Sequence, residues 1–210
     1  MLSALGDIVV FISVLYPLLY LRDFTKNSKA FKYFTAYLVI VGFIQIAMKS
    51  FKAMALGDSN LFFFVYYFVF EFVLLAFFYR QLLGYKWINV ITVVALMCIG
   101  VQYLNNPALY FVYNPIGSSI TRVILVVYSM LYFYRSLQGK REFIIVNGGL
   151  FIYLLSSVLV FASGNFLIEN ILPSYILELR TAINLTLYFL LQLLICIEWF
   201  RNYRRTKKIE

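Results

Sequence analysis

Seven long apolar stretches follow one another along the chain, and they constrain its fold more than any other feature. A helix of about 20 residues crosses the roughly 30 Å of hydrocarbon in a bilayer, and each stretch is close to that length. The apolar residues run without a break rather than alternating, so they predict helices and not the strands of a membrane barrel. We therefore expect an all-α polytopic integral membrane protein whose seven transmembrane helices lie near 3–21, 32–50, 60–80, 87–104, 117–135, 143–164 and 178–200.

The composition agrees with a chain that lies mostly in lipid. Hydrophobic residues make up 63% of the sequence and charged residues only 13%. A water-soluble domain has roughly 45–50% apolar and about 25% charged residues, and it could not bury this much apolar surface. We predict a single seven-helix transmembrane domain over residues 1–200, followed by a short basic cytoplasmic tail at 201–210.

Basic residues are concentrated in alternate gaps between the apolar stretches. Cytoplasmic loops carry an excess of Lys and Arg, so the N-terminus is expected outside and the C-terminus inside. The chain is thus predicted to be a multi-pass protein of a plasma membrane, the inner membrane of a bacterium. Topology also accounts for the formal net charge of +9, so no nucleic-acid partner is expected. The basic residues on the predicted inner side are Arg22, Lys26, Lys29, Lys32, Arg80, Lys86, Arg135, Lys140, Arg141, Arg201, Arg204, Arg205, Lys207 and Lys208.

The sequence contains no histidine, which removes several kinds of membrane enzyme. Haem sites with a His ligand, His-based zinc and di-iron sites, and Ser-His hydrolases all need that residue. Cys98 and Cys196 both lie inside apolar stretches and are interpreted as small buried hydrophobic residues. We expect no metal, no cofactor and no catalytic residues, and we predict that the chain is not an enzyme.

Polar residues inside the predicted helices gather in one layer of the membrane. Glu71 interrupts the aromatic stretch FVYYFVFEFVLLAFFYRQLLG (64–84). At 1.5 Å per helical residue it lies about 13–14 Å above Arg80, close to the middle of the membrane. Other polar residues fall at that height or farther out, which predicts a polar layer in the outer half. The candidate ligand-binding residues are Glu71, Arg122, Asp7, Gln45, Asn184, Gln192 and Ser156.

Three interpretations of Glu71 remain open at this point. Ionisable groups are costly in hydrocarbon and normally face a bundle interior or a wet cavity. Glu71 could therefore form the floor of an outward-opening pocket, with Arg122 as its second charged element. It could instead join an internal Glu–Arg or Glu–Gln pair that fixes helix packing. It could also be protonated, because desolvation disfavours the charged form of a carboxyl group.

Small residues recur along the sixth stretch. Gly149, Ser156 and Ser163 are spaced seven residues apart. Small side chains let two membrane helices approach closely. The pattern therefore predicts close packing of another helix along this seam.

Four stretches, which together extend over most of the chain, carry a resemblance. They are YYFVFEFVLLAFFYRQLL (66–83), YSMLYFYRSL (128–137), REFIIVNGGLFIYLLSSVLVFASGNFL (141–167) and LYFLLQLLICIEWFRNYRR (187–205). This combination resembles stand-alone bacterial seven-helix membrane proteins of the sensor-module type, some of which are associated with histidine kinases. The resemblance implies a membrane sensor. The chain departs from it in having no kinase and no phospho-accepting residue, so a sensor's output would have to pass to a separate partner protein.

Three functions are compatible with these features. The first is a receptor-like sensor or accessory protein that binds a small or lipidic ligand in an outward-facing polar pocket and signals to a separate cytoplasmic or membrane protein. The alternative is a small-solute transporter or channel with Glu71 and Arg122 on its path. The third is a lipid-modifying enzyme that uses Glu71 or Asp7. Membrane lipids are expected partners in every case, and the basic tail is expected to dock anionic headgroups.

Overall fold

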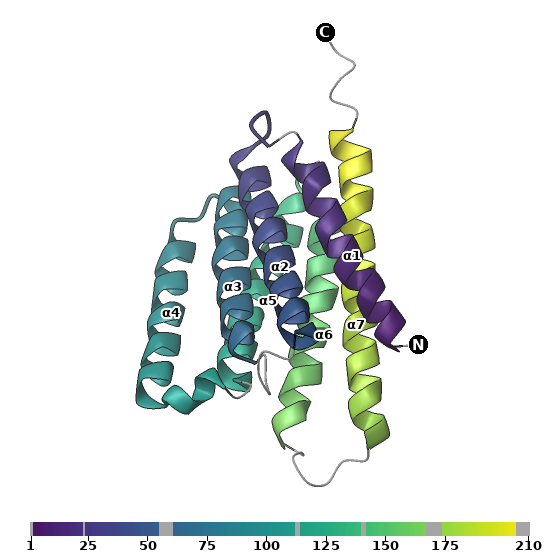
Figure 1. Cartoon of the computed structure of the whole chain (residues 1–210). Coiled ribbons are helices and arrows are strands. Elements are labelled where there is room, and N and C mark those ends of the chain that lie inside the picture. The colour runs from purple at the N-terminus through teal and green to yellow at the C-terminus, as the bar shows by residue number, and fades with distance from the viewer. Residues whose placement is uncertain are drawn as a thin grey trace.

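The computed structural model describes residues 2–22, 24–54, 61–111, 114–139, 142–166 and 174–204. Within these ranges the chain forms seven α-helices and no strand, which confirms the all-α prediction (Figure 1). A 3-10 helix, η1 (Pro107–Tyr110), follows the fourth, and a π-helix, η2 (Trp199–Tyr203), continues the last. The α-helices are α1 (Leu2–Leu21), α2 (Lys29–Ala53), α3 (Phe62–Leu83), α4 (Trp87–Asn105), α5 (Pro115–Ser136), α6 (Ile144–Phe166) and α7 (Ser174–Glu198).

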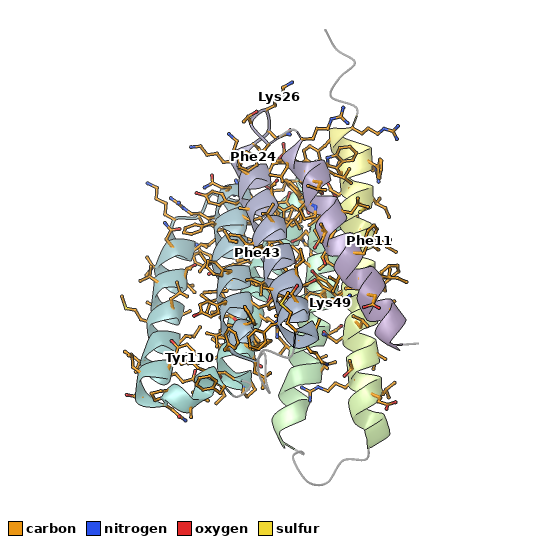
Figure 2. The ribbon with its side chains drawn as sticks, viewed as in Figure 1. Phe11, Phe24, Lys26, Phe43, Lys49 and Tyr110 are labelled. Carbon is orange, nitrogen blue, oxygen red and sulfur yellow. The ribbon has the colours of Figure 1, made fainter. Side chains whose placement is uncertain are left out.

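The helices have the length and surface of membrane helices. Five described segments are long and apolar enough to cross a bilayer, namely α2, α3, α4, α5 and Glu178–Tyr203. Two further apolar segments, in α1 and α6, are shorter. Phe11 and Phe43 project from α1 and α2 with 69% and 70% of their surface exposed (Figure 2). Exposed large apolar side chains of this kind suit contact with lipid, and the chain is a helical membrane protein.

Local signals set several helix ends. Ser28 caps α2 by accepting a hydrogen bond from the backbone N–H of Phe31. Asn114 caps α5 in the same way, and Pro115 occupies the first helical position. Gly84 ends α3 with a φ of 70°, a left-handed conformation that glycine adopts without a Cβ clash.

Six of the α-helices form a closed ring. Its order is α1, α2, α3, α5, α6 and α7, and α7 packs against α1 again. Helix α4 lies outside the ring and packs on α3 and η1 (Figure 1). Because chain direction alternates with each helix, α3 and α5 run parallel to one another. Because α4 lies outside the ring, α3 and α5 contact each other directly.

Aromatic side chains fill the end of the ring where α2 begins and α7 ends. We call Phe31, Phe34, Phe78, Phe143 and Tyr203 the aromatic plug; all five are buried. The ring of Phe143 lies 5.3 Å from that of Phe34, 5.2 Å from Phe78 and 5.5 Å from Tyr203. Each such contact contributes about 0.5–1.5 kcal/mol beyond the burial of area. Tyr203, from the predicted tail at 201–210, is buried in this plug, and residues 205–210 lie outside the described chain.

A buried carboxylate holds the start of α6 beside this plug. Glu198 accepts hydrogen bonds from the backbone N–H groups of Phe143 at 3.1 Å, Ile145 at 3.0 Å and Val146 at 3.4 Å. Negative charge is stabilised at a helix N-terminus, where these N–H groups have no partner within the helix. Phe143 has a φ of 61°, an uncommon conformation for a residue with a side chain. Glu198 therefore ties α7 to the first turn of α6.

Glycines mark two close helix contacts. A Cβ at Gly149 would lie 2.9 Å from the Leu194 side chain of α7, so the close approach predicted for this seam is observed there. A Cβ at Gly42 would lie 2.7 Å from the backbone oxygen of Ser13, across the contact of α1 and α2. The side chain of Ser163, also in the predicted seam, lies outside the described part of the structure.

Candidate functional site

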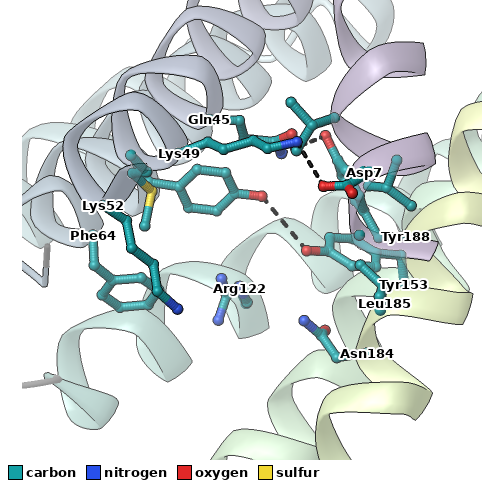
Figure 3. A pocket seen from close by; sticks show the side chains of 15 residues that line it. Asp7, Gln45, Lys49, Lys52, Phe64, Arg122, Tyr153, Asn184, Leu185 and Tyr188 are labelled. Atoms are coloured by element: carbon teal, nitrogen blue, oxygen red, sulfur yellow. Dashed lines mark hydrogen bonds and ion pairs between the residues drawn. The ribbon is translucent and has the colours of Figure 1, made fainter. Parts of the chain in front are cut away.

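A cavity of about 450 Å³ lies inside the ring, at the end opposite the aromatic plug. Helix α2 extends from the plug to the cavity, since Phe31 of the plug is near its start and Lys49 and Lys52 of the cavity are near its end. Cavities of this size accommodate small-molecule ligands. All six helices of the ring contribute to its wall (Figure 3), which consists of Gly6, Asp7, Val9, Val10, Gln45, Met48, Lys49, Lys52, Phe64, Tyr67, Arg122, Tyr153, Asn184, Leu185 and Tyr188.

A buried ion pair stands at the α3–α5 side of the cavity. Nε of Arg122 lies 3.4 Å from Oε2 of Glu71, and the two side chains are only 2% and 1% exposed. Nη1 of Arg122 also donates a hydrogen bond to Oγ of Ser118 at 2.6 Å. Arg122 is part of the cavity wall. Glu71 is not, and it contacts the wall through its ion pair with Arg122. Glu71 therefore belongs to a Glu–Arg pair between two helices, and it is not part of the cavity wall as the pocket interpretation expected.

A chain of hydrogen bonds organises the α1–α2–α7 side. The Gln45 amide accepts a hydrogen bond from Ser13 at 2.9 Å and donates one to the hydroxyl of Tyr188 at 2.8 Å. The hydroxyls of Tyr188 and Tyr16 lie 3.3 Å apart. One amide group therefore links three helices and fixes the position of Tyr188 in the wall.

Charged residues from α1 and α2 also line the cavity. Nζ of Lys49 lies 2.7 Å from Oδ1 of Asp7, and both side chains are at least half exposed. Figure 3 shows this pair bridging the two helices. Lys52 extends toward the space between Phe64 and Arg122. Within the described residues Lys52 makes no salt bridge.

Four of the seven predicted site residues line this cavity: Asp7, Gln45, Arg122 and Asn184. Their role in binding a ligand stays a prediction. Glu71 contacts one of them, Arg122. Two further predicted residues, on α6 and α7, are not in the cavity wall.

Gln192 and Ser156 are absent from the wall for different reasons. Gln192 is buried and donates a hydrogen bond to the backbone oxygen of Val9 at 3.0 Å, so it supports the wall from behind. Ser156 is only half-buried, because the inward face of α6 passes through Tyr153 and Ser157, one helical turn apart. Ser157 is buried but does not line the cavity either.

Eleven of the 15 wall residues are not among the predicted site residues, and three of these are tyrosines. The hydroxyls of Tyr67 and Tyr153 lie 3.5 Å apart, between α3 and α6. With 18 tyrosines in the chain, residue type by itself selects none of them. The available signal was spacing, because Tyr67 and Tyr188 each precede a predicted polar residue by four positions, on the same helix face.

The wall offers charged, hydrogen-bonding and apolar groups. The described residues contain no group of three or more Cys, Asp or Glu side chains that could hold a metal ion. Comparisons of the chain with known protein families, with curated proteins and with solved structures find no match.

Proposed function

We propose that the chain is a receptor-like sensor or accessory subunit of a bacterial inner membrane. It binds a small or lipidic ligand in the cavity and passes a conformational change to a separate partner protein. The observation that supports this proposal best is a cavity with polar and charged groups in its wall at one end of a ring whose other end is filled by the aromatic plug.

The proposed topology has seven crossings, with the N-terminus outside and the C-terminus inside. Helices α1 and α6 contain 20 and 23 residues and belong to the same ring as α2, α3, α5 and α7. Lysines and arginines gather at the plug end, which by the positive-inside bias is the cytoplasmic end. The cavity would then open outward. The described basic residues at the plug end are Arg22, Lys26, Lys29, Lys32, Arg80, Lys86, Arg135, Arg201 and Arg204.

A blind cavity favours a receptor over a channel. Between the cavity and the plug, the hydroxyls of Tyr79 and Ser129 donate hydrogen bonds to Oδ1 of Asn147 at 2.8 and 2.9 Å. These three side chains are buried and join α3, α5 and α6. A channel needs a continuous polar path, whereas packed side chains here separate the cavity from the opposite end.

The buried ion pair gives the ligand a means of acting on the bundle. A ligand shifts a conformational equilibrium only through different affinities for the two states. A ligand that contacts Arg122 alters its attraction to Glu71 and hence the packing of α3 against α5. Both helices run on to the cytoplasmic end, where a partner would detect their displacement.

A small-solute transporter is the second candidate. The same ion pair favours it, because Glu71 and Arg122 lie at the inner side of the cavity, where a solute would have to pass. Glu71 could then carry a proton. The two candidates differ in one measurable property, since a transporter moves its ligand across the membrane and a receptor does not. A lipid-modifying enzyme ranks third, and it predicts turnover of a lipid.

Native mass spectrometry of the purified protein in nanodiscs tests the proposed binding site. Leu185→Trp places a large ring in the cavity, while Leu190→Trp, on the same helix, alters a side chain that is 48% exposed. We expect a bound small molecule on the wild type and on Leu190→Trp but not on Leu185→Trp. An adduct that is absent from the wild type, or equally retained by both variants, would contradict the proposal. Uptake of the identified molecule into proteoliposomes would favour the transporter.

A further inference from the structure

We infer that the ligand of this cavity is an amphipathic anion, with a carboxylate or phosphate head and an apolar body. This inference rests on the proposed binding function and specifies its ligand class. It is carried by the imbalance of charge in the wall, by the hydrogen-bonding groups beside it, and by the apolar surface that completes the cavity.

The charge imbalance is positive. Three cations line the cavity: Lys49, Lys52 and Arg122. The carboxylates of Asp7 and Glu71 are engaged by Lys49 at 2.7 Å and by Arg122 at 3.4 Å. Among the described residues, no carboxylate lies within salt-bridge distance of Lys52. An anionic head beside Lys52 would balance this charge, whereas a cationic head would add to it.

Hydrogen-bonding groups lie on the far side of the same space. Figure 3 shows Arg122 between Lys52 and Asn184. Oδ1 of Asn184 is buried and has no hydrogen-bond partner among the described residues. An amide oxygen accepts hydrogen bonds, so this atom suits a donor such as the O–H of a protonated phosphate or of the ligand's body. The lysine and arginine side chains suit an oxygen-rich anion.

Five apolar side chains in the wall favour a ligand with an apolar body over a bare anion. Val9, Val10, Met48, Phe64 and Leu185 cover the other sides of the cavity. A small hydrated anion would leave these side chains against water. An alkyl chain or aromatic ring attached to the anion would instead bury them, with a favourable contribution for each buried CH2 group.

The ligand's chemistry is the same whether it enters from the lipid or from water. Decanoate, decan-1-ol and decyltrimethylammonium share one alkyl chain and differ in head charge, and 3-phenylpropanoate is a water-soluble acid. Each would be titrated against the wild-type protein in phosphatidylcholine nanodiscs, with intrinsic fluorescence as the readout and empty nanodiscs subtracted. The variant is Lys52→Gln, and its matched control is Lys86→Gln, an exposed lysine at the opposite end.

We expect decanoate to bind about tenfold or more tightly than decan-1-ol, as one charge-assisted contact provides. Lys52→Gln should remove most of that difference, and Lys86→Gln should leave it. Binding of decanoate alone assigns a membrane-borne ligand, and binding of 3-phenylpropanoate assigns a water-borne acid; either supports the inference. Equal affinity for all three head groups, or unchanged selectivity in Lys52→Gln, would overturn it while leaving the cavity a binding site. Binding of no probe, together with no adduct in native mass spectra, would overturn both proposals.

Discussion

Arg122 of α5 and Glu71 of α3 form an ion pair, 3.4 Å apart and almost fully buried, beside the cavity of the helix ring. The pair joins two helices that are not consecutive in the chain. It differs in burial from the pair of Lys49 and Asp7, which lines the same cavity and is exposed. The two pairs should therefore respond very differently to loss of a carboxylate.

Glu71→Gln should destabilise the protein by about 3–5 kcal/mol, because it leaves the buried guanidinium of Arg122 without its counter-charge. Asp7→Asn is the matched control, and it should cost at most about 1 kcal/mol because its pair is exposed. Unfolding by sodium dodecyl sulfate in mixed micelles, followed by far-UV circular dichroism, measures both. Equal stability of the two variants would show that the buried pair does not hold α3 and α5 together.

Glu198→Gln should loosen the first turn of α6. Three backbone N–H groups lose a charged acceptor, at an expected cost of about 1–3 kcal/mol. Glu142→Gln provides the comparison, since Glu142 is exposed. Hydrogen exchange of residues 143–146 should become faster in Glu198→Gln only. Unchanged exchange in that variant would rule out a capping role for Glu198.

Adjacent glycines on α6 allow a closely matched test of helix packing. Gly149→Ala should cost about 1 kcal/mol, the low end for overpacking, because its Cβ would lie 2.9 Å from Cδ1 of Leu194, the end of a flexible side chain. Gly148→Ala has room, with its nearest neighbour 3.9 Å away, and should be neutral or slightly stabilising through its higher helix propensity. The same unfolding assay compares them. If the alanine at 148 proved the more harmful, the described contact between α6 and α7 would be wrong.

Helix positions could be predicted from the sequence because the thickness of the bilayer fixes the length of an apolar stretch. The predicted ends were less accurate. The expected second helix, 32–50, extends in fact over Lys29–Ala53. Hydropathy marks the part of a helix inside hydrocarbon, and lysines at either end continue the helix while their ammonium groups reach water. Whether all seven helices cross the membrane stays a prediction.

The site was partly predictable for a similar reason. Counting residues from a helix end gives the depth of a residue in the membrane. Asp7, Gln45 and Arg122 were expected at similar depths, and all three line one cavity. Depth does not give the direction in which a side chain points, so it could not show that Ser156 lies outside the cavity wall. Nor does it give the order of helices in the ring. Glu198 acts on backbone groups more than 50 residues earlier in the chain, a long-range contact that residue spacing does not reveal.

Site-directed labelling shows whether the cavity opens to the outside of the cell, as the proposed function requires. Leu185→Cys, in a background without Cys98 and Cys196, would be exposed on intact cells to a membrane-impermeant maleimide. Lys86→Cys, at the plug end, and Leu190→Cys, on the exposed face of α7, serve as comparisons. We predict labelling at position 185 in intact cells, at position 86 only after lysis, and at position 190 in neither. Labelling of position 86 but not 185 in intact cells would contradict an outward-opening cavity.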